Sequence, residues 1–372
     1  MHPIVGLVTS FLALTIPLVL LARISFLGKG ERKDSHSLSV IIPARNEEKR
    51  IVPLLESLRS QSVRPSEVCV VDDSSTDQTA EIVKKHGYRV VQCPILPEGW
   101  TGKSWACWNG VHSTEGELLL FLDADVTLKK DALERLLFEY ERTGGLISVQ
   151  PFHLMSRFHE YFSAFFNMIV MMSMRSFSFF GKWIQPLGAF GPVILCSRKD
   201  YLIVGGHERI RTSILEDVEL GQAFIAQRIP VTPKGGRGSI SFRMYPEGFR
   251  TLTEGWGKNF ASGASKTDLV TLVSMIVIIT GWISLLIGFA QLPVQPFHWA
   301  HIYYPVAYIC AVFELRWLWS KIGSFGYVSA ILFPVHLLFF VGIFFVSMFF
   351  TMKKKRVHWK GRTVIIHKDD QE

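Results

Sequence analysis

Long apolar runs at the two ends of the chain enclose a region in which short apolar runs alternate with polar ones. The first long run, residues 4–22, has the length of one crossing of about 30 Å of hydrocarbon. No basic stretch precedes it and no small-residue cleavage site follows it, so it predicts a membrane anchor rather than a signal peptide. Arg23 and Lys29 begin a basic group behind it, which predicts that the following residues stay in the cytosol.

Short apolar runs alternate with amphipathic stretches between residues 38 and 149. The apolar runs are 38–42, 68–71, 88–91, 118–122 and 146–149, and the amphipathic stretches are 47–61, 77–86 and 131–141. Strand-length apolar runs that alternate with helices are typical of a mainly parallel, twisted sheet with helices on both faces. The predicted fold class is therefore α/β.

The last part of the chain returns to longer apolar runs. Residues 157–180 are rich in Met and Phe but contain several polar side chains, which favours a helix lying in the membrane interface over a span. Residues 269–290 and 327–350 are long enough to cross a membrane, whereas 302–319 contains an acidic and a basic residue.

The basic run at residues 353–356 predicts that the end of the chain is cytosolic. Three crossings after a cytosolic domain would place this end outside, so we expect residues 302–319 not to span. The predicted parts are a transmembrane anchor (1–23), a cytosolic catalytic domain (38–266), a transmembrane region (267–352) and a basic cytosolic tail (353–372).

Composition agrees with a multi-pass membrane protein that has a globular part. Of 372 residues, 48% are hydrophobic, including 28 Phe, but 19% are charged, which is too many for spanning helices alone. This balance excludes intrinsic disorder, and 5 scattered Cys exclude a disulfide scaffold. The net charge is +8, and the basic residues cluster beside apolar runs, which favours contact with anionic membrane lipids over nucleic acid.

Two acidic motifs follow predicted strands of the α/β region. Asp72, Asp73 and Asp77 come after the second strand, and Asp123 and Asp125 come after the fourth. Because ligands of open parallel sheets bind at the carboxyl ends of the strands, both motifs are directed at one crevice. Asp also forms turns and caps helices, and this role accounts for Asp77.

The pair Asp123 and Asp125 suits a hard divalent cation, Mg²⁺ or Mn²⁺, whose coordination is commonly completed by phosphate oxygens. The chain has neither a Walker loop nor the GxGxxG fingerprint of dinucleotide enzymes. These features argue against an ATPase or a dehydrogenase. They favour an enzyme that uses a metal-chelated nucleotide diphosphate as a leaving group.

The chain contains the motifs IIPARNEE (41–48), DDSSTD (72–77), DAD (123–125) and ED (216–217). In order and spacing these motifs resemble the inverting family 2 glycosyltransferases of the GT-A fold. A further set, GWTGKSWACW (99–108), FRMYPEGF (242–249), EGW (254–256) and WKGR (359–362), extends the resemblance over almost the whole chain. It resembles the membrane glycosyltransferases of staphyloxanthin-type carotenoid synthesis, which esterify diaponeurosporenoate with glucose from UDP-glucose.

The resemblance implies roles on the donor side of the site. Asp73 would accept a hydrogen bond from the uracil ring, and Lys103 would lie near the nucleotide unless it is a solvated turn lysine. Asp123 would contact the ribose or the metal, and Asp125 would ligate the metal. The residues that would line the uridine are Pro43, Ala44 and Glu47.

On the acceptor side, Asp217, next to Glu216, matches the general base of the family; the less favoured alternative is a carboxylate that only begins a helix. The Gln-x-x-Arg-Trp of processive members is replaced by EGWGK at 254–258, which indicates one transfer per acceptor. Trp256 could still stack on acceptor or sugar, and Lys258 could approach the diphosphate. His207 could be structural or bind the acceptor.

The expected function is transfer of one sugar, glucose by resemblance, from a UDP-sugar to the carboxylate of a carotenoid acid at the bacterial cell membrane. Two alternatives remain open. The acceptor could be another lipid, such as a polyprenyl phosphate, a ceramide-like lipid or diacylglycerol. A membrane transporter with a nucleotide-sensing domain is a more distant reading, since charged residues are sparse in the predicted spans.

Overall fold

The computed structural model describes residues 3–31, 34–181, 183–266, 268–294, 299–354, 356–359 and 362–365. Within these, the side chains of residues 3, 4, 258–266, 294 and those after 348 are not described. The chain divides into two units. The sheet unit comprises residues 25–154, 186–244 and 350–372, and the helical unit comprises residues 1–24, 155–185 and 245–349.

The centre of the sheet unit is a seven-stranded sheet in the order β3-β2-β1-β4-β8-β6-β9. Its strands are β1 (Leu38–Ala44), β2 (Glu67–Asp72), β3 (Arg89–Gln92), β4 (Leu118–Leu122), β6 (Leu146–Gln150), β8 (Val193–Ser197) and β9 (Val231–Gly235). Strand β8 runs antiparallel to β4 and β6, and the other neighbouring strands pair in parallel. The predicted α/β class with a mainly parallel sheet is confirmed.

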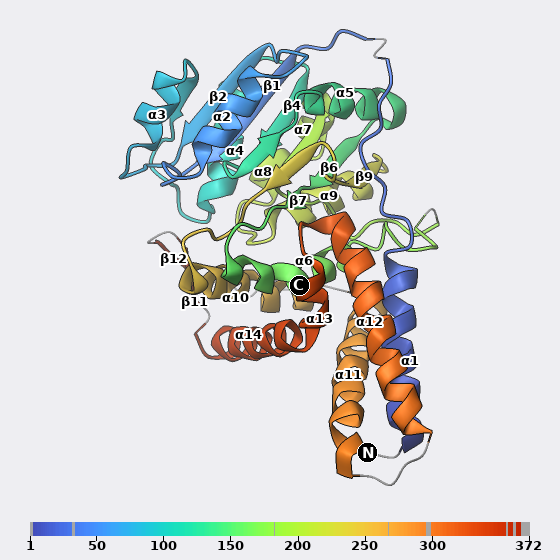
Figure 1. The fold of residues 1–372 in the computed structure, drawn as a ribbon. Coiled ribbons are helices and arrows are strands. Elements are labelled where there is room, and N and C mark those ends of the chain that lie inside the picture. Colours follow the sequence, from blue (N-terminus) through green and yellow to red (C-terminus); the bar gives the residue numbers. More distant parts are fainter. Residues whose placement is uncertain are drawn as a thin grey trace. The chain divides into compact units, whose positions relative to one another are not determined.

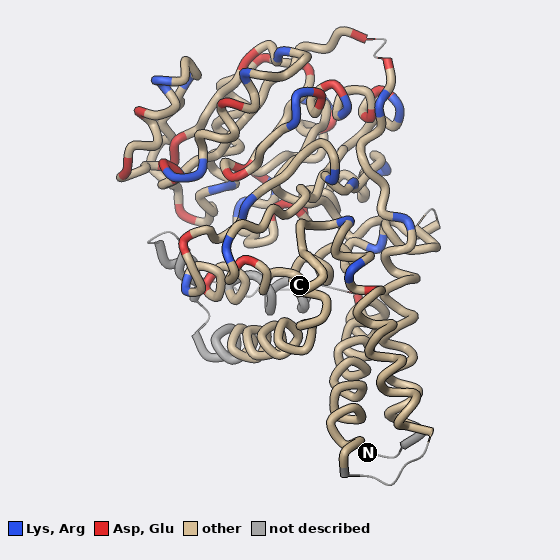
Figure 2. The backbone as a smooth tube through the Cα atoms, in the orientation of Figure 1, with Lys and Arg blue, Asp and Glu red and all other residues tan. Residues whose placement is uncertain are grey.

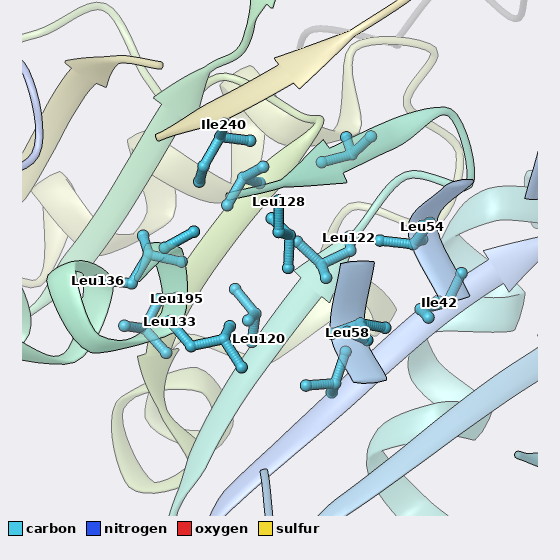
Figure 3. Packing of buried hydrophobic residues seen from close by; sticks show 14 of the residues in the cluster. Ile42, Leu54, Leu58, Leu120, Leu122, Leu128, Leu133, Leu136, Leu195 and Ile240 are labelled. Atoms are coloured by element: carbon cyan, nitrogen blue, oxygen red, sulfur yellow. The ribbon is translucent and has the colours of Figure 1, made fainter. Parts of the chain in front are cut away.

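Helices cover both faces of this sheet, because successive residues of its strands point to opposite sides. Val40 packs in one core with Leu54 of α2 and Leu133 of α5, whereas its neighbour Ile41 packs in the other core with Cys107 of α4. Figure 1 shows the helices around the sheet, and Figure 3 shows side chains of the first core. The helices are α2 (Ile51–Arg59), α3 (Thr79–Lys85), α4 (Gly102–His112), α5 (Ala132–Thr143), α7 (Arg198–Ile203), α8 (Gly206–Arg209) and α9 (Glu216–Ala226).

Two smaller sheets belong to the same unit. Strands β5 (Val126–Leu128), β10 (Ile240–Phe242) and β7 (Phe152–His153) form a three-stranded sheet with β10 in the middle. Strands β11 (Arg356–Trp359) and β12 (Arg362–Ile365) form an antiparallel pair. Strand β5 of the three-stranded sheet begins directly after the turn that follows β4, so pairing of β5 with β10 supports the position of that turn.

In the helical unit, α1, α11 and α12 lie side by side, and charged residues are nearly absent along most of their length (Figures 1 and 2). Gly281 of α11 lies directly against Thr9 and Ala13 of α1, with no room for a side chain between the helices. The elements are α1 (Pro3–Leu20), η1 (Phe158–Ser163), α6 (Ala164–Ser173), α10 (Phe249–Lys266), α11 (Leu269–Gln291), η2 (Leu292–Val294), α12 (Ala300–Ile322), α13 (Tyr327–Ile331) and α14 (Phe333–Lys354).

The apolar helices differ in part from the predicted spans. In the described part of the chain, Leu269–Gln291 is the one helix long and apolar enough to cross a membrane. The apolar parts of α1 and α14 are shorter, Val5–Leu20 and Phe333–Met348, so spans at the two ends of the chain are not confirmed and stay predictions. The continuous run predicted at 327–350 is broken at Leu332. Pro334 has no N–H to donate to the carbonyl of Ala330, and its ring would clash with that carbonyl, whereas the first turn of a new helix tolerates a proline.

The units also divide the chain differently from the single domain predicted at 38–266. Residues 155–185 and 245–266 belong to the helical unit. The reason is aromatic packing: Phe165 of α6 contacts Trp282 and Trp319 at ring distances of 5.2 and 5.4 Å. The helix predicted at 157–180 ends at Ser173, and its placement at a membrane interface remains a prediction.

Candidate functional site

The loops after β1 and β2 are joined by hydrogen bonds at the carboxyl edge of the sheet. Ala44 pairs with Asp72 in register, so the two strands end level. The Asn46 side chain accepts a hydrogen bond from the backbone N–H of Thr76 at 2.8 Å, and the N–H of Glu48 donates to Asp77 at 3.2 Å. Asp77 also accepts from Thr79 at the start of α3, which confirms its structural role.

Asp73 lies at the start of the second of these loops. Its side chain is 5% exposed, and its backbone N–H donates to the carbonyl of Ala44 at 2.9 Å. Arg45 donates to the carbonyl of Asp73 at 2.6 Å and its guanidinium lies 3.7 Å from the carboxylate. Of the predicted uridine residues, Pro43 and Ala44 therefore end strand β1, and Glu47 and Asp73 lie in the two joined loops that follow β1 and β2.

The DAD motif forms the turn between β4 and β5. The backbone N–H of Asp123 donates to the carbonyl of Pro192 at 2.9 Å, and the N–H of Val126 donates to the carbonyl of Asp123 at 3.2 Å. The side chains of Asp123 and Asp125 are both half-buried, on either side of the buried Ala124. Backbone hydrogen bonds therefore hold the turn and leave two carboxylates at the end of a central strand.

Lys103 connects this turn to the ED motif. Its Nζ lies 2.9 Å from Asp123 Oδ1 and 3.1 Å from Glu216 Oε1, and its side chain is 25% exposed. Burial alone would lower the pKa of Lys103, but the carboxylates of Asp123, Glu216 and Asp217 raise it well above its ordinary value. The alternative of a solvated turn lysine is wrong, because Lys103 is the cation at the centre of three carboxylates.

Asp217 lies in the first turn of α9. Its Oδ1 accepts a hydrogen bond from the backbone N–H of Val218 at 3.0 Å, so it is a helix-start carboxylate as well as a pocket residue. Burial, and next to it the charge of Glu216, raises the pKa of Asp217 to about 7, while the Lys103 ammonium opposes this rise. A carboxyl group with this pKa exists in both protonation states near neutral pH.

His207 forms part of the wall of the pocket. Its side chain is buried, Nδ1 lies 2.9 Å from the hydroxyl of Tyr201, and the ring packs edge-on against Phe121. Burial, aided by the Lys103 ammonium, lowers the pKa of His207 to about 3, so the ring is neutral. These contacts show a structural role, and a contact of His207 with the acceptor stays a prediction.

The structure brings five of the predicted site residues, Pro43, Lys103, Asp123, Glu216 and Asp217, to one pocket. The full lining consists of Pro43, Lys103, Cys107, Phe121, Leu122, Asp123, Gly191, Ile194, His207, Glu216 and Asp217. Sequence reasoning missed Gly191 and the support from Tyr201 and Pro192. Neither glycine nor proline carries a chemical signal by residue type, and Tyr201 lies in a short helix, after three charged residues, with no motif around it.

Trp256 and Lys258 lie on α10 of the helical unit. The ring of Trp256 is buried, stacks on Phe166 at 4.8 Å and donates its N–H to Ser163 at 3.0 Å. This packing shows a structural role for Trp256, and its acceptor role is untested. The side chain of Lys258 lies outside the described part of the chain.

A divalent cation fits the chemistry of the DAD turn. Its two carboxylates are hard oxygen donors, and Mg²⁺ and related ions are commonly held by one or two carboxylates plus the phosphates of a substrate. Among the residues that the structure describes, no group of three or more His, Cys, Asp or Glu side chains is placed to hold a metal alone.

Comparison with known proteins gives the family context of this site. Residues 39–184 match the model of glycosyl transferase family 2. The chain is 38% identical over 343 residues to the 4,4'-diaponeurosporenoate glycosyltransferase of Staphylococcus aureus strain USA300, covering 90% of this chain and 89% of that protein. The enzyme of that name from strain MRSA252 matches equally, at 38% identity over 343 residues and the same coverage.

A solved structure shares the fold. The mannosyltransferase PcManGT from Pyrobaculum calidifontis, solved in complex with GDP-Man and Mn²⁺, superposes with a TM-score of 0.58. The superposition covers 94% of this chain and 99% of that chain at 14% sequence identity. At this identity the similarity shows the fold alone, which is the α/β GT-A fold with a mixed sheet.

Proposed function

Because this chain belongs to glycosyl transferase family 2, we propose that it is an inverting, non-processive enzyme that moves one glucose from UDP-glucose to the carboxylate of a carotenoid acid of the diaponeurosporenoate type. The observation that carries the acceptor is the 38% identity over 90% of the chain to a glycosyltransferase named for diaponeurosporenoate. The site supports the reaction type: the pocket contains Asp123 of the DAD turn and the Glu216–Asp217 pair. The two joined loops follow β1 and β2 at the carboxyl edge of the same sheet.

The reaction forms one bond and breaks one bond at the anomeric carbon of the sugar. A carboxylate oxygen of the acceptor attacks this carbon on the face opposite the diphosphate, and the bond to the diphosphate oxygen breaks. An ester forms with inversion and UDP leaves. A carboxylic acid has an unperturbed pKa of roughly 4, so this acceptor arrives ionised and no proton has to be removed.

For such an acceptor, Asp217 serves better as a neutral group than as a base. An ionised Asp217 would repel the incoming carboxylate, while a protonated Asp217 donates a hydrogen bond to it. The pKa of about 7 leaves a large neutral fraction at neutral pH. Lys103 keeps a positive charge beside the reacting groups through its pairs with Asp123 and Glu216.

A divalent cation held by Asp123 and Asp125 would offset the charge of the diphosphate as it leaves. Mg²⁺ and Mn²⁺ both suit the two carboxylates. The uridine would lie on the loops after β1 and β2, with Asp73 accepting a hydrogen bond from the uracil. Glu216 would lie on the acceptor side. Trp256 would stack on acceptor or sugar, and Lys258 would approach the diphosphate.

We expect Asp73→Ala to raise the donor KM by about 10- to 100-fold and to leave kcat within a few-fold, because a hydrogen bond to a charged group contributes about 1.5–3 kcal/mol. The backbone bond from Asp73 to Ala44 survives the substitution, so the loop stays in place. Steady-state kinetics with varied UDP-glucose measures both constants. An unchanged donor KM would mean that Asp73 does not contact the uracil.

The acceptor is tested by Asp217→Asn. With a carotenoid acid we expect a loss of no more than about tenfold at pH 7, the scale of one altered hydrogen bond. The wild-type rate should fall as the pH rises through about 7, because the neutral form of Asp217 disappears. Asparagine stays neutral, so the cost of the substitution should shrink as the pH rises. Initial rates of glucose transfer to the purified acid, measured on both sides of pH 7, check this.

The opposite result would identify a hydroxyl acceptor. Removal of a general base typically costs about 10²–10⁴-fold, and the wild-type rate would then rise with pH through about 7. The intact Glu216–Asp217 pair is the observation that favours this second candidate, an alcohol-bearing lipid such as a ceramide-like lipid or diacylglycerol. A loss of about 10³-fold with unchanged donor binding would establish it.

We also propose that the protein is anchored in the bacterial cell membrane with the sheet unit in the cytosol. Arg23 and Lys29 follow the apolar helix α1, which supports this orientation. The apolar helix α11 supports attachment to the membrane. A water-insoluble acceptor would then be supplied from the lipid phase, with membrane lipids as the surroundings of the helical unit.

A further inference from the structure

Residues 188–192, which precede β8, run between the two carboxylate-bearing elements of the pocket. The carbonyl of Pro192 accepts the backbone N–H of Asp123 at 2.9 Å. The backbone N–H of Phe190 donates to the buried hydroxyl of Ser148 at 2.6 Å. The segment is therefore fixed to β4 on one side and to β6 on the other.

The same segment packs against α9 backbone to backbone. A Cβ added at Gly188 would collide with the carbonyl and Cα of Val218, and one added at Gly221 would collide with the backbone of Gly188 and Ala189. In both contacts the nearest atoms are backbone atoms, which cannot move aside as a flexible side chain could. These glycines set the distance between the segment and the helix that carries Asp217.

Gly191 differs, because it faces a side chain. A Cβ built there would lie 2.5 Å from Asp217 Oδ2 and 3.0 Å from Asp217 Cγ. The backbone of Gly191 lies outside the left-handed region, so alanine is compatible with its conformation. Since the surrounding backbone is fixed, an added methyl group would turn the carboxylate of Asp217 away from Gly191 and from its hydrogen bond with Val218.

We propose that Gly191 is a positioning residue: the space left by its missing side chain is occupied by the Asp217 carboxylate, whose Oδ2 edge is thereby held at the pocket wall. Both residues line the pocket, which places the effect at the reacting end of the acceptor. The proposal rests on the proposed function in one respect, that Asp217 faces the acceptor. It adds a residue whose only chemical property is the absence of a side chain.

The test is a double-mutant cycle on the full-length protein with Gly191→Ala, Asp217→Ala and the combined variant. Alanine at position 217 removes the carboxylate, whereas asparagine would keep a group of the same shape beside Gly191. We expect Gly191→Ala to leave the donor KM unchanged and to lower kcat for transfer to the carotenoid acid by up to about tenfold, the scale of one altered hydrogen bond. For hydrolysis by water the loss should be about 10- to 100-fold, the scale of a 1 Å misplacement at a reacting group. In the Asp217→Ala background the same change should cost less than about threefold, because the carboxylate that it displaces is already gone.

Gly116→Ala is the packing control. A Cβ there would collide with Ser39 Oγ, at the start of β1 and away from α9, so its loss of activity and of thermal stability should be the same in both backgrounds. A loss on Gly191→Ala that is equally large with aspartate and with alanine at position 217 would overturn the proposal. So would a Gly191→Ala protein with full activity and an unchanged melting temperature.

Each arm is measured twice, with the carotenoid acid as acceptor and with water, as hydrolysis of UDP-glucose. If wild-type protein transfers nothing to the carotenoid acid while the cycle with water shows the expected coupling, the proposed acceptor is wrong and the role of Gly191 stands. If transfer to the acid is efficient and the coupling is absent, the role of Gly191 is wrong and the proposed function stands.

Discussion

The substitution Asp125→Ala is expected to lower turnover by at least about 10³-fold, since a metal ion at a leaving diphosphate supplies several kcal/mol of charge stabilisation. The fold should remain intact, because the turn is held by the backbone bonds of Asp123 and Val126. Turnover with UDP-glucose at saturating Mg²⁺ or Mn²⁺ measures the loss. Mn²⁺ binding in the presence of UDP, followed by electron paramagnetic resonance, should weaken in parallel.

Asp131→Ala is a suitable control for this experiment. Asp131 is a carboxylate of the same unit that pairs with Lys29 and Arg135, and its side chain is 33% exposed. Surface pairs contribute about 0–1 kcal/mol, so turnover and Mn²⁺ binding should stay near wild type. Near wild-type turnover of Asp125→Ala at saturating metal would contradict the assignment of the DAD turn as the metal site.

The second large effect is expected for Lys103→Ala. Loss of two charge-assisted hydrogen bonds should lower kcat/KM by about 10²–10³-fold. Removal of the ammonium group also removes the charge that opposes the rise in the pKa of Asp217, so this pKa should move above its wild-type value of about 7. When water is the acceptor, Asp217 must be ionised to take a proton from it. The rise of UDP-glucose hydrolysis with pH should therefore shift to higher pH in this variant.

Lys103→Arg separates charge from shape. Arginine keeps the cation, so the pH dependence should stay close to wild type, although the bonds to Asp123 and Glu216 will not be reproduced at 2.9 and 3.1 Å. A pH profile that is the same for Lys103→Ala, Lys103→Arg and wild type would mean that Lys103 does not set the protonation of Asp217. Thermal unfolding of each variant reports whether the three carboxylates tolerate the loss of their common partner.

The central strands were predictable because the signal for each lies within a few neighbouring residues. The apolar runs at 38–42, 68–71 and 118–122 coincide with β1, β2 and β4, since a strand inside a sheet that is covered on both faces is largely apolar. The run at 88–91 coincides with the edge strand β3, in which only Val90 and Val91 are apolar. The reversed direction of β8 and the sheet β5-β10-β7 were not predictable in this way. Ser241 pairs with Thr127 and Phe152, and no local pattern records a partner so distant in sequence.

The candidate site shows the same division. Asp73, Asp123 and Asp125 stand next to strands, so their common edge follows from parallel topology alone. The position of Asp217 came from a motif resemblance, and its bridge to Asp123 through Lys103 required the folded chain. Gly191 could not be recognised at all, because its role is to leave space, and space exists only between segments brought together by folding.

For the apolar part of the chain, the sequence by itself determined where the apolar side chains lie, and the tertiary structure decided what they do. Hydropathy counts apolar residues without their partners, so residues 157–180 and 327–350 could be read as one interfacial helix and one span. In the structure, Phe165 and Phe166 pack against rings of α10, α11, α12 and α14, and Pro334 divides the last run. Burial against another segment of the chain and burial in lipid both require apolar side chains, so the sequence cannot distinguish them. Only the packing of segments that are distant in sequence does so.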